Sequence, residues 1–388
     1  MRFKNLYFIL IAVMIGSCTQ NNENEVTAAN EADVETLYVG TYTKKEGHVD
    51  GKGDGIYKVQ VNKETGELTV IDTILNTVNP SYITIHPNKK FLYAVNEIAD
   101  GNRIGTVTAY NIEKDEILRI SSITSKGDAP CHVSVDQTGQ FLTVANYMEV
   151  IAIYKIQGNG DSELTESVEF KTTRKSEFRQ EASHTHMVLH AFDDNSMFVA
   201  DLGRDLVYHY QMESSGKLKE LAPIETMFKA GPRHLAAHPN QSRLYVLNEL
   251  NSTIEGFDYQ GVDKPTKRFQ TVSTVEQEAE NIAPSAIKIH PNGKFLYSAN
   301  RAINDGTVNN IAVFSINEES GELELIQSQD SKGLVPRDFT ISPDGNFLFV
   351  ANQNSNTIIT FKINQETGKL EETGNVLEIS TPVCLKFL

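Results

Sequence analysis

The chain has 388 residues and a formal net charge of −16, from 35 Lys and Arg against 51 Asp and Glu residues. A body this acidic disfavours nucleic acid and anionic membrane surfaces as partners, because both would repel it. Hydrophobic residues make up 39% of the chain, which is enough for a sizeable core, and the length alone suggests two domains or more.

Residues 1–17 have the pattern of an export signal. Arg2 and Lys4 precede an apolar run from Leu6 to Ile15, which is too short to span a membrane as a stable anchor. Small residues then stand before Cys18, as in the cleavage box of bacterial lipoproteins. We therefore expect lipidation of Cys18 and a protein anchored to the cell envelope, facing the periplasm or the surface. An ordinary secreted protein that is cut nearby is the alternative.

Residues 18–35 are rich in Asn, Glu and Ala and are expected to form a flexible tether. Beyond them a hairpin recurs at intervals of about fifty residues. In each clear copy the residue after a Pro and the residue after an Asn lie sixteen positions apart, and a turn between two apolar strands separates them. The five clear copies run from Ser81 to Glu97, from Cys131 to Tyr147, from Arg233 to Glu249, from Ser285 to Arg301 and from Arg337 to Gln353.

Two further copies are less obvious. A weaker one runs from His186 to Leu202 and keeps the sixteen-residue interval. The last is split between the chain ends, because residues 381–387 supply a first strand with nothing after it and residues 37–42 a second strand with nothing before it. Joined, the two ends complete a seventh unit from Val383 to Tyr42.

Seven units of four short strands, without long amphipathic helices between them, predict an all-β fold, a seven-bladed β-propeller. Pairing of the N- and C-terminal strands in one blade would close the ring and remove its open edge. Because blades pack only on their neighbours, residues 36–388 are expected to form one domain, and we expect a monomer.

The fourteen positions at the hairpin ends are expected to lie at one mouth of the propeller. If each turn centres on its Asn-Gly pair or the equivalent, the two residues of a copy face each other across an antiparallel ladder. The repeats resemble one another around these positions, yet the positions themselves range over acid, base, imidazole and phenol. Divergence at one layer of a symmetric scaffold is what a functional site would produce.

Among these pairs, Arg233 opposite Glu249 points most clearly to a functional site. Arginine binds a carboxylate or phosphate, and Glu can act as a general base, although the pair could also be a structural salt bridge. His186 adds a group that titrates near neutral pH, with His184 two residues earlier, and a purely structural histidine is the alternative. Arg301 and Arg337 could clamp an anion or lie on the rim.

His132 and His234 follow the ring positions, so we expect them to point away from the mouth and to be structural. Cys131 and Cys384 belong to non-adjacent units and are expected to be free thiols. No Cys or His spacing fits a zinc site, and we expect neither a metal nor a cofactor.

The motifs of the repeats also resemble a known family. The resemblance covers residues 37–388 and identifies the chain as similar to the seven-bladed lactonases, which include a bacterial type of 6-phosphogluconolactonase and the fungal carboxy-muconate cyclase. Eleven stretches carry it in order: residues 37–43, 79–82, 130–133, 145–147, 184–186, 200–205, 231–234, 248–250, 298–301, 336–339 and 351–353.

The resemblance implies hydrolysis of a sugar lactone at the propeller mouth. The family's histidine, glutamate and two arginines carry over to His186, Glu249, Arg233 and Arg301, with His184 as the fallback imidazole. Around them we expect the substrate to be contacted by His184, Arg337, Glu97, Tyr147 and Gln353.

Two features depart from this picture. The segment after Tyr147 lacks the family's glycine-rich link, and phosphorylated sugar lactones are made in the cytoplasm whereas this chain carries an export signal. We therefore expect a different lactone, or a sugar acid, as the small-molecule partner. Two alternatives stay open: a muconate-type lactonizing cycloisomerase, and a non-catalytic propeller that binds a ligand or a protein on the cell envelope.

Overall fold

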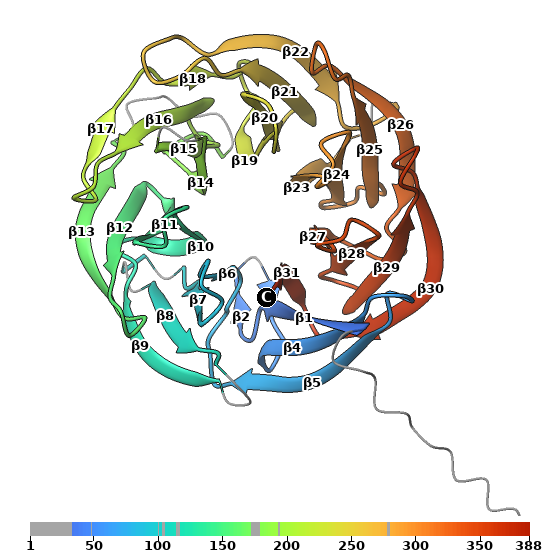
Figure 1. Ribbon diagram of the computed structural model, residues 1–388, viewed down its shortest axis with the longest axis horizontal. Coiled ribbons are helices and arrows are strands. Elements are labelled where there is room, and N and C mark those ends of the chain that lie inside the picture. Colours follow the sequence, from blue (N-terminus) through green and yellow to red (C-terminus); the bar gives the residue numbers. More distant parts are fainter. Residues whose placement is uncertain are drawn as a thin grey trace, which may run out of the picture.

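The computed structural model describes residues 33–47, 49–99, 101–102, 105–113, 117–171, 179–192, 195–277 and 280–388. Its strands form a ring of seven sheets around a central axis (Figure 1), which confirms the predicted seven-bladed propeller. The predicted export signal, Cys18 and most of the predicted tether lie outside the described residues. Within the described ranges no helix is long and apolar enough to cross a membrane.

Six blades are continuous in the chain. Blade 1 consists of β6 (Ile83–Ile85), β7 (Phe91–Asn96), β8 (Thr106–Asn111) and β9 (Leu118–Thr124). Blade 2 consists of β10 (Asp128–Val135), β11 (Phe141–Met148), β12 (Val150–Ile156) and β13 (Ser162–Glu169). Blade 3 consists of β14 (Thr185–Ala191), β15 (Ser196–Asp201), β16 (Leu206–Met212), β17 (Leu218–Glu220) and β18 (Ile224–Glu225).

The next three follow the same order, from the innermost strand to the outermost. Blade 4 consists of β19 (Pro232–Ala237), β20 (Arg243–Asn248), β21 (Thr253–Asp258) and β22 (Lys267–Ser273). Blade 5 consists of β23 (Ile282–Ile289), β24 (Phe295–Ala302), β25 (Asn310–Ile316) and β26 (Leu323–Asp330). Blade 6 consists of β27 (Pro336–Ile341), β28 (Phe347–Asn352), β29 (Thr357–Ile363) and β30 (Leu370–Glu378).

The closing blade joins the two ends of the chain, as predicted. It consists of β31 (Pro382–Phe387), β1 (Val34–Thr41), β4 (Gly55–Asn62) and β5 (Leu68–Leu75), in that order from the axis outwards. Strand β1 begins two residues before the predicted start of the domain, because Val34 and Glu35 still pair with the end of β4. A small hairpin of β2 (Lys45–Glu46) and β3 (Val49–Asp50) follows β1.

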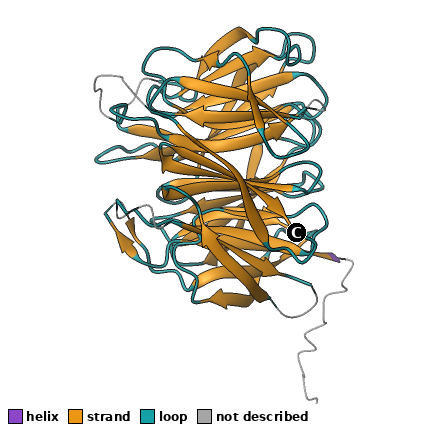
Figure 2. Cartoon of the chain, turned by 90° about the vertical axis from the view of Figure 1, so that its left-hand side faces the viewer, coloured by secondary structure: helices purple, strands orange, loops and turns teal. Residues whose placement is uncertain are grey.

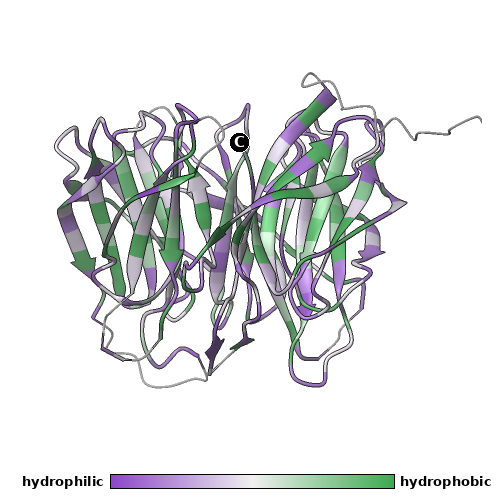
Figure 3. Cartoon of the chain, turned by 90° about the horizontal axis from the view of Figure 1, so that it is seen from below, coloured by the Kyte–Doolittle hydropathy of each residue, from purple (hydrophilic) through white to green (hydrophobic). Residues whose placement is uncertain are grey.

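The core lies between neighbouring blades. Because successive side chains of a strand point to opposite faces, each sheet has an apolar surface on both sides. In β1, Leu37 and Val39 pack against Phe349 of blade 6, whereas Tyr38 packs on the side of blade 1. Seen from the side, the blades stack closely (Figure 2), and hydrophobic residues run along the strands while hydrophilic ones gather in the loops of both faces (Figure 3).

A β-bulge interrupts the first hairpin of each blade at the end where the chain enters it. In blade 4, Pro232 pairs with Asn248 and His234 with Leu247, so Arg233 is an extra residue without a partner across the ladder. The same shift in register leaves an extra residue at Cys131, His186, Ser285, Arg337 and Val383. In blade 1, Ser81 lies between the hydrogen bonds from Glu97 N to Asn79 O and from Val95 N to Tyr82 O, which have the same arrangement.

The predicted cross-strand pairing was therefore wrong, by one residue within the hairpin and by two residues beyond the bulge. Glu249 donates its backbone N–H to Gly231 O at 2.8 Å rather than lying opposite Arg233. A bulge bends its strand and re-aims the side chain of the extra residue. The seven residues of the bulges are turned towards the axis in this way. The backbone is strained beside them, since the β-branched Val335 and Thr381 have φ angles of 59° and 45°.

The contact between the closing blade and blade 1 yields a test of the closure. Gly40 of β1 lies so close to blade 1 that a Cβ atom would meet the backbone oxygen of Pro80. We expect Gly40→Ala to lower the free energy of unfolding by about 1–3 kcal/mol, measured by urea unfolding, because a backbone atom must move. Gly47→Ala, whose Cβ would meet nothing within 4 Å, is the matched control and should change it by less than about 0.5 kcal/mol. Equal effects of the two substitutions would contradict this view of the closure.

Candidate active site

A cavity of about 390 Å³ opens at the mouth on the side of the bulges. Its walls come from blades 1 to 6, and they combine charged side chains with apolar surface. The lining residues are Glu97, Ala99, Ala129, Cys131, Tyr147, Met148, Arg179, His186, Arg233, Glu249, Arg301, Ile303 and Arg337. Four arginines and two glutamates thus line the cavity, which gives it an excess of positive charge within a chain of net charge −16.

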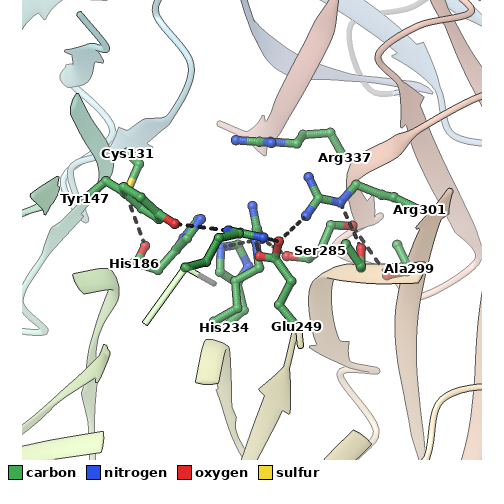
Figure 4. Close-up of polar contacts among 12 residues, drawn as sticks. Cys131, Tyr147, His186, His234, Glu249, Ser285, Ala299, Arg301 and Arg337 are labelled. Atoms are coloured by element: carbon green, nitrogen blue, oxygen red, sulfur yellow. Dashed lines mark hydrogen bonds and ion pairs between the residues drawn. The ribbon is translucent and has the colours of Figure 1, made fainter. Parts of the chain in front are cut away.

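Glu249 lies at the centre of a buried ionic cluster (Figure 4). Its Oε1 is 2.5 Å from Arg179 Nη1 and 3.3 Å from Arg301 Nη2, and its Oε2 is 2.9 Å from Arg233 Nε. Burial raises the pKa of Glu249, but Arg179, Arg301 and Arg233 together outweigh burial and hold this pKa well below its usual range. Glu249 is therefore an ionised anchor for three guanidinium groups.

The same geometry fixes the two arginines beneath the cavity floor. Arg233 also donates through Nη1 to the backbone oxygen of Ser285, and Arg301 donates through Nε to Ala283 O at 2.9 Å. Both side chains are almost completely buried. Burial lowers the pKa of Arg233 to about 10, which still leaves it charged at neutral pH.

Arg337 differs from the other three arginines. It lies above Glu249 and His234 in Figure 4, and its Nη2 donates to the Tyr42 hydroxyl at 3.2 Å. Within the described residues no carboxylate forms an ion pair with Arg337. An anionic ligand could therefore bind the Arg337 guanidinium without breaking an ion pair between this arginine and a described carboxylate of the protein.

Three buried atoms of the cluster lack hydrogen-bond partners. One is His186 Nδ1, and the other two are Glu249 Oε2 and Arg233 Nε, which lie 2.9 Å apart without the alignment of a hydrogen bond. Burial, and then the charge of Arg233, hold the pKa of His186 well below its usual range, so the imidazole is neutral at neutral pH. A buried polar atom without a partner is costly, and sites that bind a water or a ligand are where such atoms are expected.

Arg179 is a site residue that the repeat did not reveal. It lies in the connection between β13 and β14, and its Nε and Nη2 donate to the Tyr147 hydroxyl at 3.3 and 3.1 Å. The next residue, the buried Gln180, holds this part of the connection through bonds to Leu202 O and Asp205 Oδ1. The signal in the sequence was the interval of 55 residues from Cys131 to His186, the longest between copies.

Most of the predicted site residues meet in the cavity, and two do not. His184 lies behind Tyr147, on which its ring stacks with centroids 4.3 Å apart. Gln353 is directed towards Asn354, whose Oδ1 accepts a bond from its Nε2 at 3.0 Å, and it lines a separate cleft beside β3. The structure thus brings together His186, Arg233, Glu249, Arg301, Glu97, Tyr147 and Arg337.

The expected direction of His132 and His234 was wrong, whereas their structural role stays a prediction. Because the bulge shifts the register, the residue after it also reaches the axis, where Tyr82, His132 and His234 meet one layer below the cavity. The Tyr82 and His132 rings are 4.2 Å apart, and His234 lies 5.4 Å from His186 and 6.1 Å from His132. The propeller channel therefore holds two polar layers, not one.

The described residues contain no group of three or more His, Cys, Asp or Glu side chains that could hold a metal ion. Cys131 and Cys384 are free and buried, as predicted.

Comparison with known proteins assigns the chain to a family. The family model of the seven-bladed β-propeller lactonases matches residues 36–387. The chain belongs to this family, as the motifs of its repeats predicted.

Particular relatives narrow the class. The chain is 33% identical over 355 residues to the 6-phosphogluconolactonase of Bacillus subtilis strain 168, covering 90% of this chain and 97% of the relative. It is 29% identical to the 6-phosphogluconolactonase of Formosa agariphila, covering 90% and 99%. Among solved structures, the periplasmic gluconolactonase of Pseudomonas aeruginosa has a TM-score of 0.83 and 26% identity, covering 92% of this chain and 99% of that one.

Proposed function

We propose that the protein hydrolyses a sugar lactone in the mouth cavity. The observation that carries this proposal is the neutral, buried His186 with its unpartnered Nδ1 beside the Glu249–arginine cluster. A neutral imidazole in contact with water is a suitable general base, and guanidinium groups stabilise the oxyanion of acyl transfer. Family membership and the names of the relatives support the same reaction.

In this mechanism His186 is the base, and Glu249 is not. A carboxylate held by three arginines is a poor proton acceptor, because protonation would break three charge contacts. Water attacks the lactone carbonyl carbon while its proton passes to His186 Nδ1. The ring ester bond then breaks, and the leaving ring oxygen takes the proton from His186, so that one hydroxy acid is formed.

The arginines divide into two groups in this proposal. Arg233 and Arg301, tied to Glu249, present fixed positive charge to the carbonyl oxygen. Arg337, which has no carboxylate contact among the described residues, would bind an anionic group of the substrate. Tyr147, Arg179 and Glu97 complete the walls of the cavity.

We also infer that the chain is exported and anchored through Cys18. The charged, apolar and small-residue segments before Cys18 support this proposal, as does the likeness to a gluconolactonase described as periplasmic. A periplasmic or surface location favours a lactone other than a cytoplasmic phosphorylated intermediate.

The base assignment predicts the kinetics of His186→Gln. On a lactone that the wild type hydrolyses in a pH-stat, this variant should lose about 10²–10⁴ in kcat. His190→Gln is a matched control, since His190 lies on the same strand but bonds Thr143 outside the cavity, and its kcat should stay within about threefold of the wild type.

Because only the neutral imidazole accepts a proton and its pKa is lowered, wild-type kcat/KM should be level down to about pH 6.5 and fall only in more acidic solution. Wild-type turnover by His186→Gln would rule out this base. If no lactone were hydrolysed while an intact sugar raised the melting temperature, the protein would be a binding propeller.

The anionic subsite predicts a change of preference in Arg337→Gln. Its kcat/KM on a phosphorylated sugar lactone should fall by about 10–100-fold, because a charged hydrogen bond is lost, while hydrolysis of the uncharged gluconolactone should stay within about threefold. Arg243→Gln, which removes an arginine near Asp258 far from the cavity, controls for net charge. Equal losses on both lactones would show that Arg337 does not recognise the anionic group of the substrate.

The anchor is tested by fractionation of cells that express the full chain. Cys18→Ser should move the protein from the membrane fraction to the soluble fraction, because one acylated cysteine is the only proposed attachment. Cys384→Ser removes a buried thiol elsewhere and should leave the protein in the membrane fraction. A soluble wild type would refute lipidation.

A further inference from the structure

A second, much smaller space lies directly beneath the mouth cavity. It measures about 10 Å³, close to the room that one water molecule needs. Five residues line both spaces, namely Glu97, Cys131, His186, Arg233 and Arg337, so the two share a wall. We call this space the inner void.

The inner void has polar groups on several sides. Its remaining lining consists of Ser81 and the apolar Val383 from the ring of bulges, and of Tyr82, His234 and Asp338 from the second layer of the channel. A buried water is held where two to four polar groups surround it. The inner void meets this condition, whereas a dry cavity would be lined by apolar side chains.

Hydrogen-bond directions indicate which groups would hold a water. Arg233 Nη1, which can only donate, lies 3.0 Å from His234 Nε2, so this nitrogen accepts and the proton of the neutral His234 ring is on Nδ1. His186 Nδ1 has no partner in the protein. His234 therefore brings a donor, and His186 an acceptor, to the lining of one space.

We propose that the inner void is the site of the hydrolytic water, held by His234 and activated by His186, so that attack on the lactone comes from the channel side of the mouth. This inference rests on the proposed lactonase function. The lactone occupies the outer cavity, and its carbonyl carbon takes the water oxygen from below while the water proton passes to His186. His234 is then a positioning residue, since it acts on the water through a hydrogen bond and leaves the proton transfer to His186.

Enclosure of the nucleophile has a chemical consequence. A space of this size admits water and excludes alcohols and the hydroxyl groups of other sugars. The enzyme would therefore hydrolyse its substrate without transferring the acyl group to a second sugar, even where sugars are abundant.

Val383 permits a test that leaves the polar groups in place. It is buried, it occupies the bulge of β31, and it is the lining residue whose size can be changed without removing a hydrogen bond. Val383→Ile adds one methylene group and should fill the inner void, whereas Val383→Ala enlarges it. On a lactone that the wild type hydrolyses, Val383→Ile should lose at least about tenfold in kcat with KM within about twofold, because the nucleophile is displaced.

In aqueous methanol, Val383→Ala should form the methyl ester alongside the acid, which the wild type should not. The unfolding curve of each variant checks that it is folded. A high-resolution crystal structure of the wild type should show an ordered water between His186 and His234, and that of Val383→Ile should lack it.

A folded Val383→Ile variant with wild-type kcat would overturn the proposal, as would a wild-type crystal structure without water in the inner void. These results are separable from failure of the proposed function, which is read from the wild type alone. If the wild type hydrolyses no lactone, the role of the water as nucleophile falls with it, and the crystal structure still decides whether the inner void binds water.

Discussion

The β-bulge at the start of each innermost strand is the constraint on which the site depends. A regular strand alternates its side chains between the two faces of a sheet, and both faces of a propeller blade are packed against neighbouring blades. No side chain of a regular innermost strand would then be released from that packing. The extra residue breaks the alternation and turns Arg233, His186 and Arg337 towards the axis. Seven bulges at one end therefore create a ring of side chains that can vary without disturbing the core.

The ionic cluster in this ring is not balanced in charge. Transfer of a carboxylate and three guanidinium groups from water into a buried site is unfavourable, and the contacts of Glu249 offset this cost only in part, since one negative charge meets three positive ones. The surplus positive charge is held in place by backbone oxygens at Ser285 and Ala283, and by the Tyr147 hydroxyl. A site assembled in this way is poised to gain from a ligand that brings negative charge, whether at rest or as a developing oxyanion. The rigid blades keep the charges from relaxing away from each other.

The sequence predicted the architecture well because the repeat contains its main determinants. Apolar strands, turns that contain Asn, Asp or Gly, and a constant interval of sixteen residues define each continuous hairpin, and the split copy at the chain ends predicted the closing blade. The interval along the chain does not reveal the bulge, because the bulge shifts the pairing by one residue and leaves the interval unchanged. The bulge leaves Arg233 without a partner across the ladder and lets His132 and His234 reach the axis.

The candidate site was predictable where the repeat reaches it and not beyond. His186, Glu249, Arg233 and Arg301 occupy repeat positions and do meet in the cavity, although their roles stay predictions. Arg179 lies in a connection whose extra length shows in the interval of 55 residues, but it occupies no repeat position, so the repeat does not identify the residue itself. Gln353 occupies a repeat position but turns to Asn354, because side-chain direction at a strand end depends on neighbours that the spacing does not specify.

The net charge of the whole chain and the local charge of the cavity have different effects on an anionic substrate. The chain carries a net charge of −16, so an anionic substrate is repelled at long range, and no steering by the whole protein speeds its approach. This repulsion is screened over about 10 Å at 0.1 M salt, whereas contacts inside the cavity are screened much less. Recognition of an anion must therefore come from the arginines at short range. Discrimination between charged and neutral lactones then depends on Arg337 and its neighbours in the cavity rather than on the surface. Raised ionic strength should therefore change the rate at which the substrate associates more than the strength of its contacts in the cavity.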